Sequence, residues 1–118
     1  MKKGIILIGD LFEETEAFVT RNILLRAGME VSLVSTSEKA VCVSSNGLKV
    51  EANYLISDIT AKDFDFIVIA GGAWVSQLIK NPSAKQFKAI VYLIQDFADL
   101  KKTIAAICAA PVFLAYAG

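Results

Sequence analysis

The chain has 118 residues, of which 55% are hydrophobic and 20% charged, and its 12 basic and 12 acidic residues give zero formal net charge. This composition excludes intrinsic disorder and leaves no electrostatic footprint for nucleic acid or a membrane surface. No apolar run approaches the roughly 20 residues of a membrane span, and the length fits one domain.

The first half of the chain alternates strand and helix signals. Residues Gly4–Gly9 form a continuous apolar run, too short for a signal peptide and typical of a strand buried on both faces. Acidic residues then open a helix that stops at Gly28, with an apolar side formed by Phe18, Ile23, Leu24 and Leu25. Residues Glu30–Ser35 alternate like a second strand.

A hairpin and a buried strand follow. Residues Ala40–Val43 and Leu48–Glu51 flank a Ser-Asn-Gly turn at positions 45–47, and Asn-Gly is a strong hairpin signal. Residues Asp65–Ala70 predict another strand buried on both faces, ended by two glycines.

The last third predicts a helix, a strand and a short helix. Asn81 and Pro82 suit the start of the long helix, and residues Thr103–Ile107 predict a buried strand. Residues Ala109–Ala117 predict the short helix. The inward side of the long helix comprises Phe87, Ile90, Val91, Ile94, Phe97 and Ala98.

This order predicts an α/β sandwich, a single domain over residues 1–118, with a mostly parallel sheet and a small β-hairpin. The short last helix reaches Gly118 with no strand after it, which would leave one edge of the sheet open. We therefore expect the sequence to be a fragment without its C-terminal strand or strands and helix.

The two cysteines, Cys42 and Cys108, stand far apart, and the chain contains no histidine, so we expect no zinc site. Neither a dinucleotide-binding nor a P-loop glycine pattern occurs, and we expect no cofactor. We expect a cytoplasmic location with both thiols reduced. Cys42 lies on the hairpin, where packing is its expected role.

Cys108 is the strongest candidate for chemistry because it stands between a strand and a helix, where open α/β sheets bind ligands. The residues on either side of Cys108 in the sequence are mostly alanine, and such small residues suit a sharp turn that exposes a nucleophile. A helix N-terminus also favours the thiolate form of a cysteine. A buried structural cysteine is the alternative.

Two further positions lie at the same predicted edge. Glu16 could supply a carboxyl to a thiol on a neighbouring strand end, although all three nearby acids could simply favour the helix start. Gly71 and Gly72 permit close backbone approach and could donate N–H groups to an oxyanion, or could form an ordinary turn. Trp74 could cover a pocket or an interface, with packing as the alternative.

Three segments together resemble the ThiJ/PfpI superfamily, in its branch of protein deglycases. They are Glu-Glu-Thr-Glu-Ala at positions 13–17, Ile-Ala-Gly-Gly at positions 69–72, and Ala-Ala-Ile-Cys-Ala-Ala-Pro at positions 105–111. The resemblance covers the whole chain. It implies a flavodoxin-like three-layer sandwich, similar to class I glutamine amidotransferases, and a homodimer.

The resemblance also implies site roles. Cys108 would be the reactive thiol and Glu16 its protonated partner, with backbone N–H groups at Gly71, Gly72 and Ala109 around the substrate. The implied activities are glyoxalase or deglycase action on 2-oxoaldehydes such as methylglyoxal or on glycated substrates, and oxidative-stress sensing. Ser44 and Ser45 stand near the place where well-known members carry an arginine.

Two other classes stay open. A cysteine hydrolase would be a protease or amidotransferase, but its usual neighbours of the cysteine are replaced by alanine at Ala106, Ala109 and Ala110. A non-catalytic redox chaperone is the other alternative. None of these alternatives involves nucleic acid, a membrane or a metal.

Overall fold

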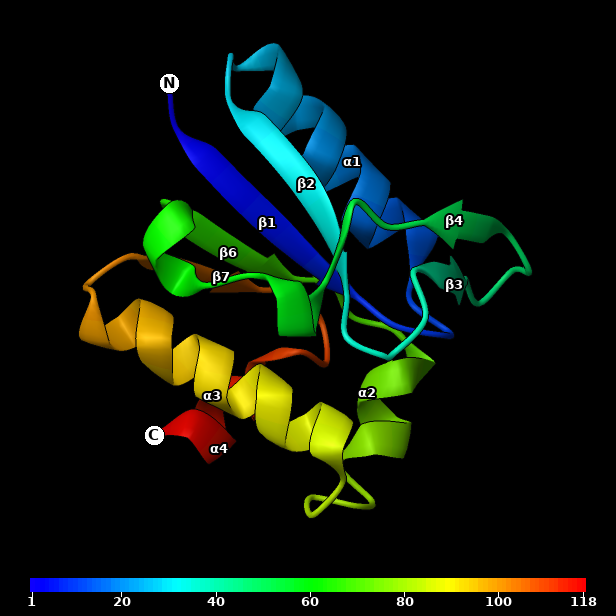
Figure 1. Ribbon diagram of the computed structural model, residues 1–118. Coiled ribbons are helices and arrows are strands. Elements are labelled where there is room, and N and C mark those ends of the chain that lie inside the picture. Colours follow the sequence, from blue (N-terminus) through cyan, green and yellow to red (C-terminus); the bar gives the residue numbers. More distant parts are fainter.

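The computed structural model describes residues 1–118 and contains one five-stranded parallel sheet (Figure 1). Its strands lie in the order β5-β2-β1-β6-β7, and every neighbouring pair is parallel. The bounds are β1 (Lys3–Ile8), β2 (Glu30–Ser35), β5 (Tyr54–Leu55), β6 (Phe66–Ile69) and β7 (Thr103–Ala106). A separate antiparallel hairpin joins β3 (Val41–Val43) to β4 (Lys49–Glu51).

Helices lie on both faces of this sheet (Figure 1). They are α1 (Glu14–Arg26), α2 (Ala73–Leu78), α3 (Lys85–Asp99) and α4 (Pro111–Ala117), with two short 3-10 turns at Ile56–Asp58 and Ala61–Asp63. From β1 the chain adds β2 and then β5 on one side of the sheet and returns to add β6 and β7 on the other, so right-handed crossovers put α1 on one face and α3 on the other. The predicted three-layer, flavodoxin-like α/β sandwich is confirmed.

The core lies between the sheet and its helices. Strand β6 is buried at every position and β1 at five of six positions, as their continuous apolar runs predict. Helix α3 buries six apolar side chains, namely Phe87, Ile90, Val91, Leu93, Ile94 and Phe97. Ala98, predicted for the same side, is exposed instead.

The start of α3 differs from its prediction. The helix begins at Lys85 after Ala84, which makes no side-chain cap. Asn81 instead shapes a turn before the helix, where its side chain accepts from the Ser83 hydroxyl at 2.8 Å and its carbonyl accepts from the Ala84 N–H at 3.0 Å. Asn81 is a residue type that often caps helices, but here its hydrogen bonds close the turn that precedes α3.

Two faces are less buried than predicted. On α1 only Ala17 is fully buried, and Ile23 is 60% exposed. On β7 the side chains of Thr103 and Ala105 are exposed, because α3 covers only the other side of this edge strand. A groove of about 360 Å³ lies on the uncovered side, with an apolar lining from Leu24, Met29, Phe66, Ile67, Val68, Ala105 and Ile107.

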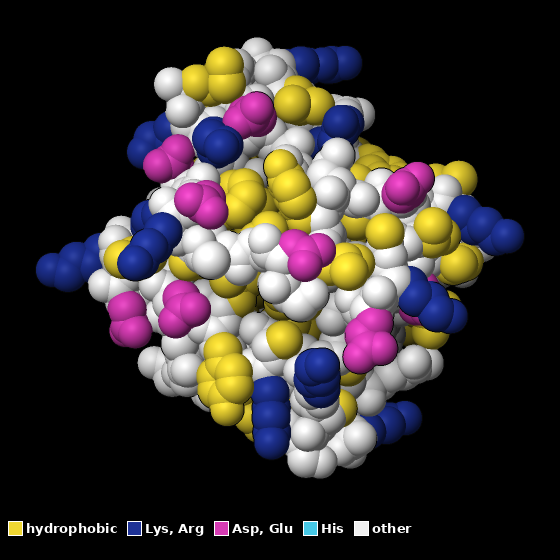
Figure 2. All heavy atoms as spheres, viewed as in Figure 1, with side chains coloured by type: hydrophobic (Ala, Val, Ile, Leu, Met, Phe, Trp, Pro, Cys, Tyr) yellow, Lys and Arg dark blue, Asp and Glu magenta, His cyan; other side chains and the backbone are white.

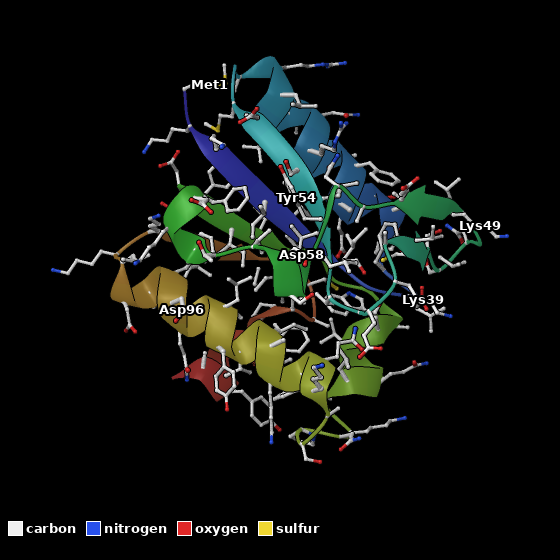
Figure 3. All side chains as sticks on the ribbon, viewed as in Figure 1. Met1, Lys39, Lys49, Tyr54, Asp58 and Asp96 are labelled. Carbon is white, nitrogen blue, oxygen red and sulfur yellow. The ribbon has the colours of Figure 1, made fainter.

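The surface carries mixed charges. Figure 2 shows basic and acidic side chains interspersed over the visible face, with no block of one sign. Figure 3 shows Lys49 at the outer end of the hairpin, away from the sheet. None of the helices combines the length and the apolar composition that a membrane-spanning segment requires.

Candidate active site

Cys108 occupies a strained turn between β7 and α4. Its φ angle is +57°, which places a non-glycine residue in the left-handed region. The Ile107 N–H donates to the Ile69 carbonyl at 3.1 Å, and the Ala110 N–H donates to the Ile107 carbonyl at 3.0 Å. These hydrogen bonds hold the turn against strain of about 1–3 kcal/mol, and the Cys108 side chain is exposed at its apex.

The three acids at the start of α1 have separate roles. Glu13 caps the helix, because its carboxylate accepts from the Thr15 N–H at 3.1 Å. Glu14 accepts from the Ser44 hydroxyl of the hairpin. Glu16, which is half-buried, accepts from the Gly71 N–H at 2.8 Å through Oε1. Glu16 therefore reaches across to the end of β6 and does not cap its own helix.

Gly71 is the point at which Glu16 and Cys108 meet. A Cβ atom built at this position would collide with Glu16 Oε1 and would lie 2.9 Å from both Cys108 Cβ and the Ile107 carbonyl oxygen. The lack of a side chain at Gly71 allows the carboxyl and the cysteine to approach the same peptide. The structure thus brings together Cys108, Glu16 and Gly71.

Gly72 lies in backbone space that only glycine occupies freely, with φ +126° and ψ 174°. A Cβ there would lie 2.6 Å from the Leu11 carbonyl oxygen and 2.7 Å from the Glu13 nitrogen. These close contacts leave no room for a side chain at residue 72.

Three backbone N–H groups around the turn have no acceptor within the protein, those of Gly72, Cys108 and Ala109. Unpaired N–H groups beside a nucleophile are the donors from which an oxyanion site is built. Gly72 and Ala109 are two of the three donors that the family resemblance implies; the third, the Gly71 N–H, donates to Glu16 instead.

Trp74 belongs to this region, although its sequence position favoured simple packing. The residue is 2% exposed, and its indole N–H is shared by the carbonyl oxygens of Ala70 at 3.1 Å and Gly71 at 3.0 Å. A tryptophan two residues after Gly72 was the only signal in the sequence, and it does not by itself specify a carbonyl as its partner.

Cys42 lies in a different environment. It is fully buried, and its thiol donates to the Ser35 hydroxyl at 3.3 Å. Burial raises the pKa of the Cys42 thiol, which keeps it in the neutral form. Its predicted packing role is confirmed. No group of three His, Cys, Asp or Glu side chains lies close enough to hold a metal ion.

The hairpin is attached beside the start of α1. The Ser45 N–H donates to the Phe12 carbonyl at 3.0 Å, and the buried Ser44 side chain accepts from the Leu48 N–H at 3.0 Å while donating to Glu14. Ser44 and Ser45 thus anchor the hairpin to this region through hydrogen bonds.

The protein is thus a parallel α/β sandwich that carries an exposed cysteine at a strand-to-helix turn. The model of the DJ-1/PfpI family matches residues 2–118, and the chain belongs to that family. The resemblance stated from the three sequence segments is thereby confirmed.

Individual relatives show how much of a family member the chain represents. It is 32% identical over 107 residues to the uncharacterized protein MJ0967 of Methanocaldococcus jannaschii, covering 91% of this chain and 49% of that protein. It is 31% identical over 102 residues to the glutathione-independent glyoxalase DJR-1.2 of Caenorhabditis elegans, covering 86% and 51%. The chain spans about half the length of these two relatives.

A solved structure supports the same assignment. Toxoplasma gondii DJ-1 in its oxidized form superposes with a TM-score of 0.85 at 28% identity, covering 100% of this chain and 62% of that chain.

The two thiols should differ sharply toward iodoacetamide. We expect rapid alkylation of one thiol in the folded protein and of both after denaturation, because Cys108 is exposed and Cys42 is buried with a raised pKa. Intact mass spectrometry with time measures this difference. Cys108→Ser should abolish the fast phase, and the matched Cys42→Ser should keep it; equal rates at both thiols would contradict the burial of Cys42.

Proposed function

We propose that this protein is a cysteine-dependent glyoxalase that converts 2-oxoaldehydes such as methylglyoxal into 2-hydroxy acids, with related action on glycated substrates. One observation is the main support: Cys108 and Glu16 converge on Gly71 beside unpaired backbone N–H groups. The relative named a glutathione-independent glyoxalase adds to it.

The reaction begins with addition of the Cys108 thiolate to the aldehyde carbon. An S–C bond forms, and the carbonyl π electrons move to oxygen to give a hemithioacetal oxyanion. The N–H groups of Gly72 and Ala109 donate to this oxygen, where the charge develops. The exposed apex of the turn leaves room for the substrate above the sulfur.

Glu16 then transfers a proton between the two substrate carbons. Its carboxyl group first gives a proton to the hemithioacetal oxygen and becomes a carboxylate. The carboxylate then removes the proton from the former aldehyde carbon, giving an enediolate. The hydroxyl proton moves to the second oxygen, and Glu16 returns the carbon proton to the neighbouring carbon. The first carbon is oxidised to a thioester while the second is reduced to an alcohol, so no external oxidant is needed. Water then cleaves the thioester, which releases the 2-hydroxy acid and regenerates the thiol.

This reaction fits the residues better than peptide or amide hydrolysis. A hydrolase must protonate a leaving amine, which is the usual task of a histidine directly beside the cysteine, and Ala109 occupies that position here. An isomerising glyoxalase has no leaving amine. It requires one thiolate, one acid–base group and an oxyanion site, which correspond to Cys108, Glu16 and the backbone N–H groups.

The catalytic role of the thiol can be tested by substitution. We expect Cys108→Ser to abolish methylglyoxal consumption, because the serine hydroxyl is a far weaker nucleophile. Glu16→Gln should lower kcat by about 10²–10⁴-fold through loss of the proton carrier. Lactate formation by the purified protein is the measurement, with Cys42→Ser as the active control. Undiminished turnover in Cys108→Ser would refute the proposal.

The same exposed thiol is proposed to sense oxidative stress. Two equivalents of hydrogen peroxide convert a thiol into a sulfinic acid and release two waters, adding two oxygen atoms to the protein. Mild peroxide should therefore add two oxygens at Cys108 and none at Cys42. Peptide mass mapping locates the added oxygens, and oxidation confined to Cys42 would contradict the sensor role.

The proposal includes a homodimer. Val19 and Ile23 lie on α1 with 50% and 60% of their side chains exposed, an apolar surface that a second copy would cover. Ile23→Lys should then shift the protein from dimer to monomer in analytical ultracentrifugation. Tyr92→Lys on α3, where Tyr92 is 59% exposed, is the matched control and should stay dimeric. A monomeric unsubstituted protein would exclude the homodimer.

A further inference from the structure

Trp74 makes a polar contact that the proposed chemistry does not yet use. It is the second residue of α2 and is almost fully buried. Its indole N–H, which can only donate, points at the carbonyl oxygens of Ala70 and Gly71, at 3.1 and 3.0 Å. A ring needed only to fill space would not require this donor, because an apolar aromatic residue fills a core equally well.

The Gly71 carbonyl accepts two hydrogen bonds. The second donor is the Glu13 N–H at the start of α1, at 3.0 Å. The two donors together fix the direction of the Gly71 carbonyl. Glu13 is the N-cap residue of α1, and Trp74 lies in α2.

The direction of this carbonyl also determines the direction of the next N–H group. The Gly71–Gly72 peptide is trans, so its C=O and N–H bonds point in opposite directions within one plane. Trp74 and Glu13 hold the oxygen side of the plane, and the unpaired Gly72 N–H leaves from the other side. Hydrogen bonds accepted by a peptide oxygen also polarise its N–H into a stronger donor.

Gly72 needs such a restraint. Two consecutive glycines rotate more freely than any other pair, and a rotation of this peptide would turn its N–H away from the site. Rigid placement of donors is what makes an oxyanion site effective, because the donors then need no reorganisation during the reaction.

The indole ring also contacts the other half of the site. It packs against Phe113 of α4, with ring centroids 5.6 Å apart and planes at 43°. Helix α4 follows the turn that holds Cys108 and Ala109. Trp74 is therefore hydrogen-bonded to the peptide before Gly72 and packed against the helix after Ala109.

We infer that Trp74 is a positioning residue that fixes the Gly72 N–H as an oxyanion donor. The inference rests on the proposed function, since it assigns Trp74 to the oxyanion site of that reaction. Trp74 contacts no substrate and acts only through the Gly71–Gly72 peptide and α4.

Removal of the indole N–H tests this role. Trp74→Phe should lower kcat for methylglyoxal by at least about tenfold, approaching the 10²–10³-fold that loss of an oxyanion donor costs, while KM changes by less than about twofold. The iodoacetamide rate at Cys108 should stay unchanged, because alkylation creates no oxyanion. An unchanged kcat would overturn the inference.

Loss of packing is controlled separately. Phe87→Leu loosens the same aromatic cluster, because Phe87 packs against Phe113 at 5.8 Å, but leaves the indole N–H intact. This variant should keep its kcat. Replacing Trp74 by its benzothiophene analogue preserves the ring shape and removes only the N–H donor, and should reproduce the kcat of Trp74→Phe. A fully active analogue would show that Trp74 acts through packing and would overturn the inference.

A measurement without substrate separates this inference from the proposed function. Trp74 is the only tryptophan, so the protein gives one indole N–H signal in NMR. We expect slow exchange of that proton with solvent, and a larger shift of the Gly72 amide signal in Trp74→Phe than in Phe87→Leu. An inactive unsubstituted protein would refute the glyoxalase proposal. A fast-exchanging indole proton or an unmoved Gly72 signal would refute the role of Trp74.

Discussion

The candidate site depends on the absence of a side chain at residue 71. Glu16 arrives from α1, Cys108 from the turn after β7, and both approach the Gly71 peptide at the end of β6. A methyl group there would separate the carboxyl from the cysteine by occupying the space where they meet. The parallel sheet supports this arrangement, since β1, β6 and β7 are adjacent and all end at the same edge.

Features governed by local periodicity could be predicted from the sequence. Unbroken apolar runs were enough to predict β1 and β6, and helical spacing was enough to predict most of the inward side of α3. Features that depend on neighbouring elements could not be predicted in this way. Residues Thr103–Ile107 look like a buried strand, yet β7 stands at the sheet edge with one side uncovered, and burial there depends on what packs against it.

The site shows the same division. Cys108, Glu16 and Gly71 could be proposed together because each follows a strand that ends at one edge of the sheet. The separate roles of Glu14 and Glu16 could not be assigned, since each depends on a partner distant in sequence, Ser44 for Glu14 and Gly71 for Glu16. Trp74 was undetermined for the same reason, because its partners are backbone oxygens that every residue possesses.

The backbone of Cys108 has a consequence for how substitutions at this position would accumulate. Glycine adopts a φ of +57° without the steric penalty that a β-carbon incurs. The free energy of unfolding is therefore lower with cysteine at position 108 than it would be with glycine. Selection for stability alone would favour glycine, and only selection for a thiol opposes it. Relatives that lose the chemistry while keeping the fold should therefore drift toward glycine or asparagine here, which makes residue 108 an indicator of function across the family.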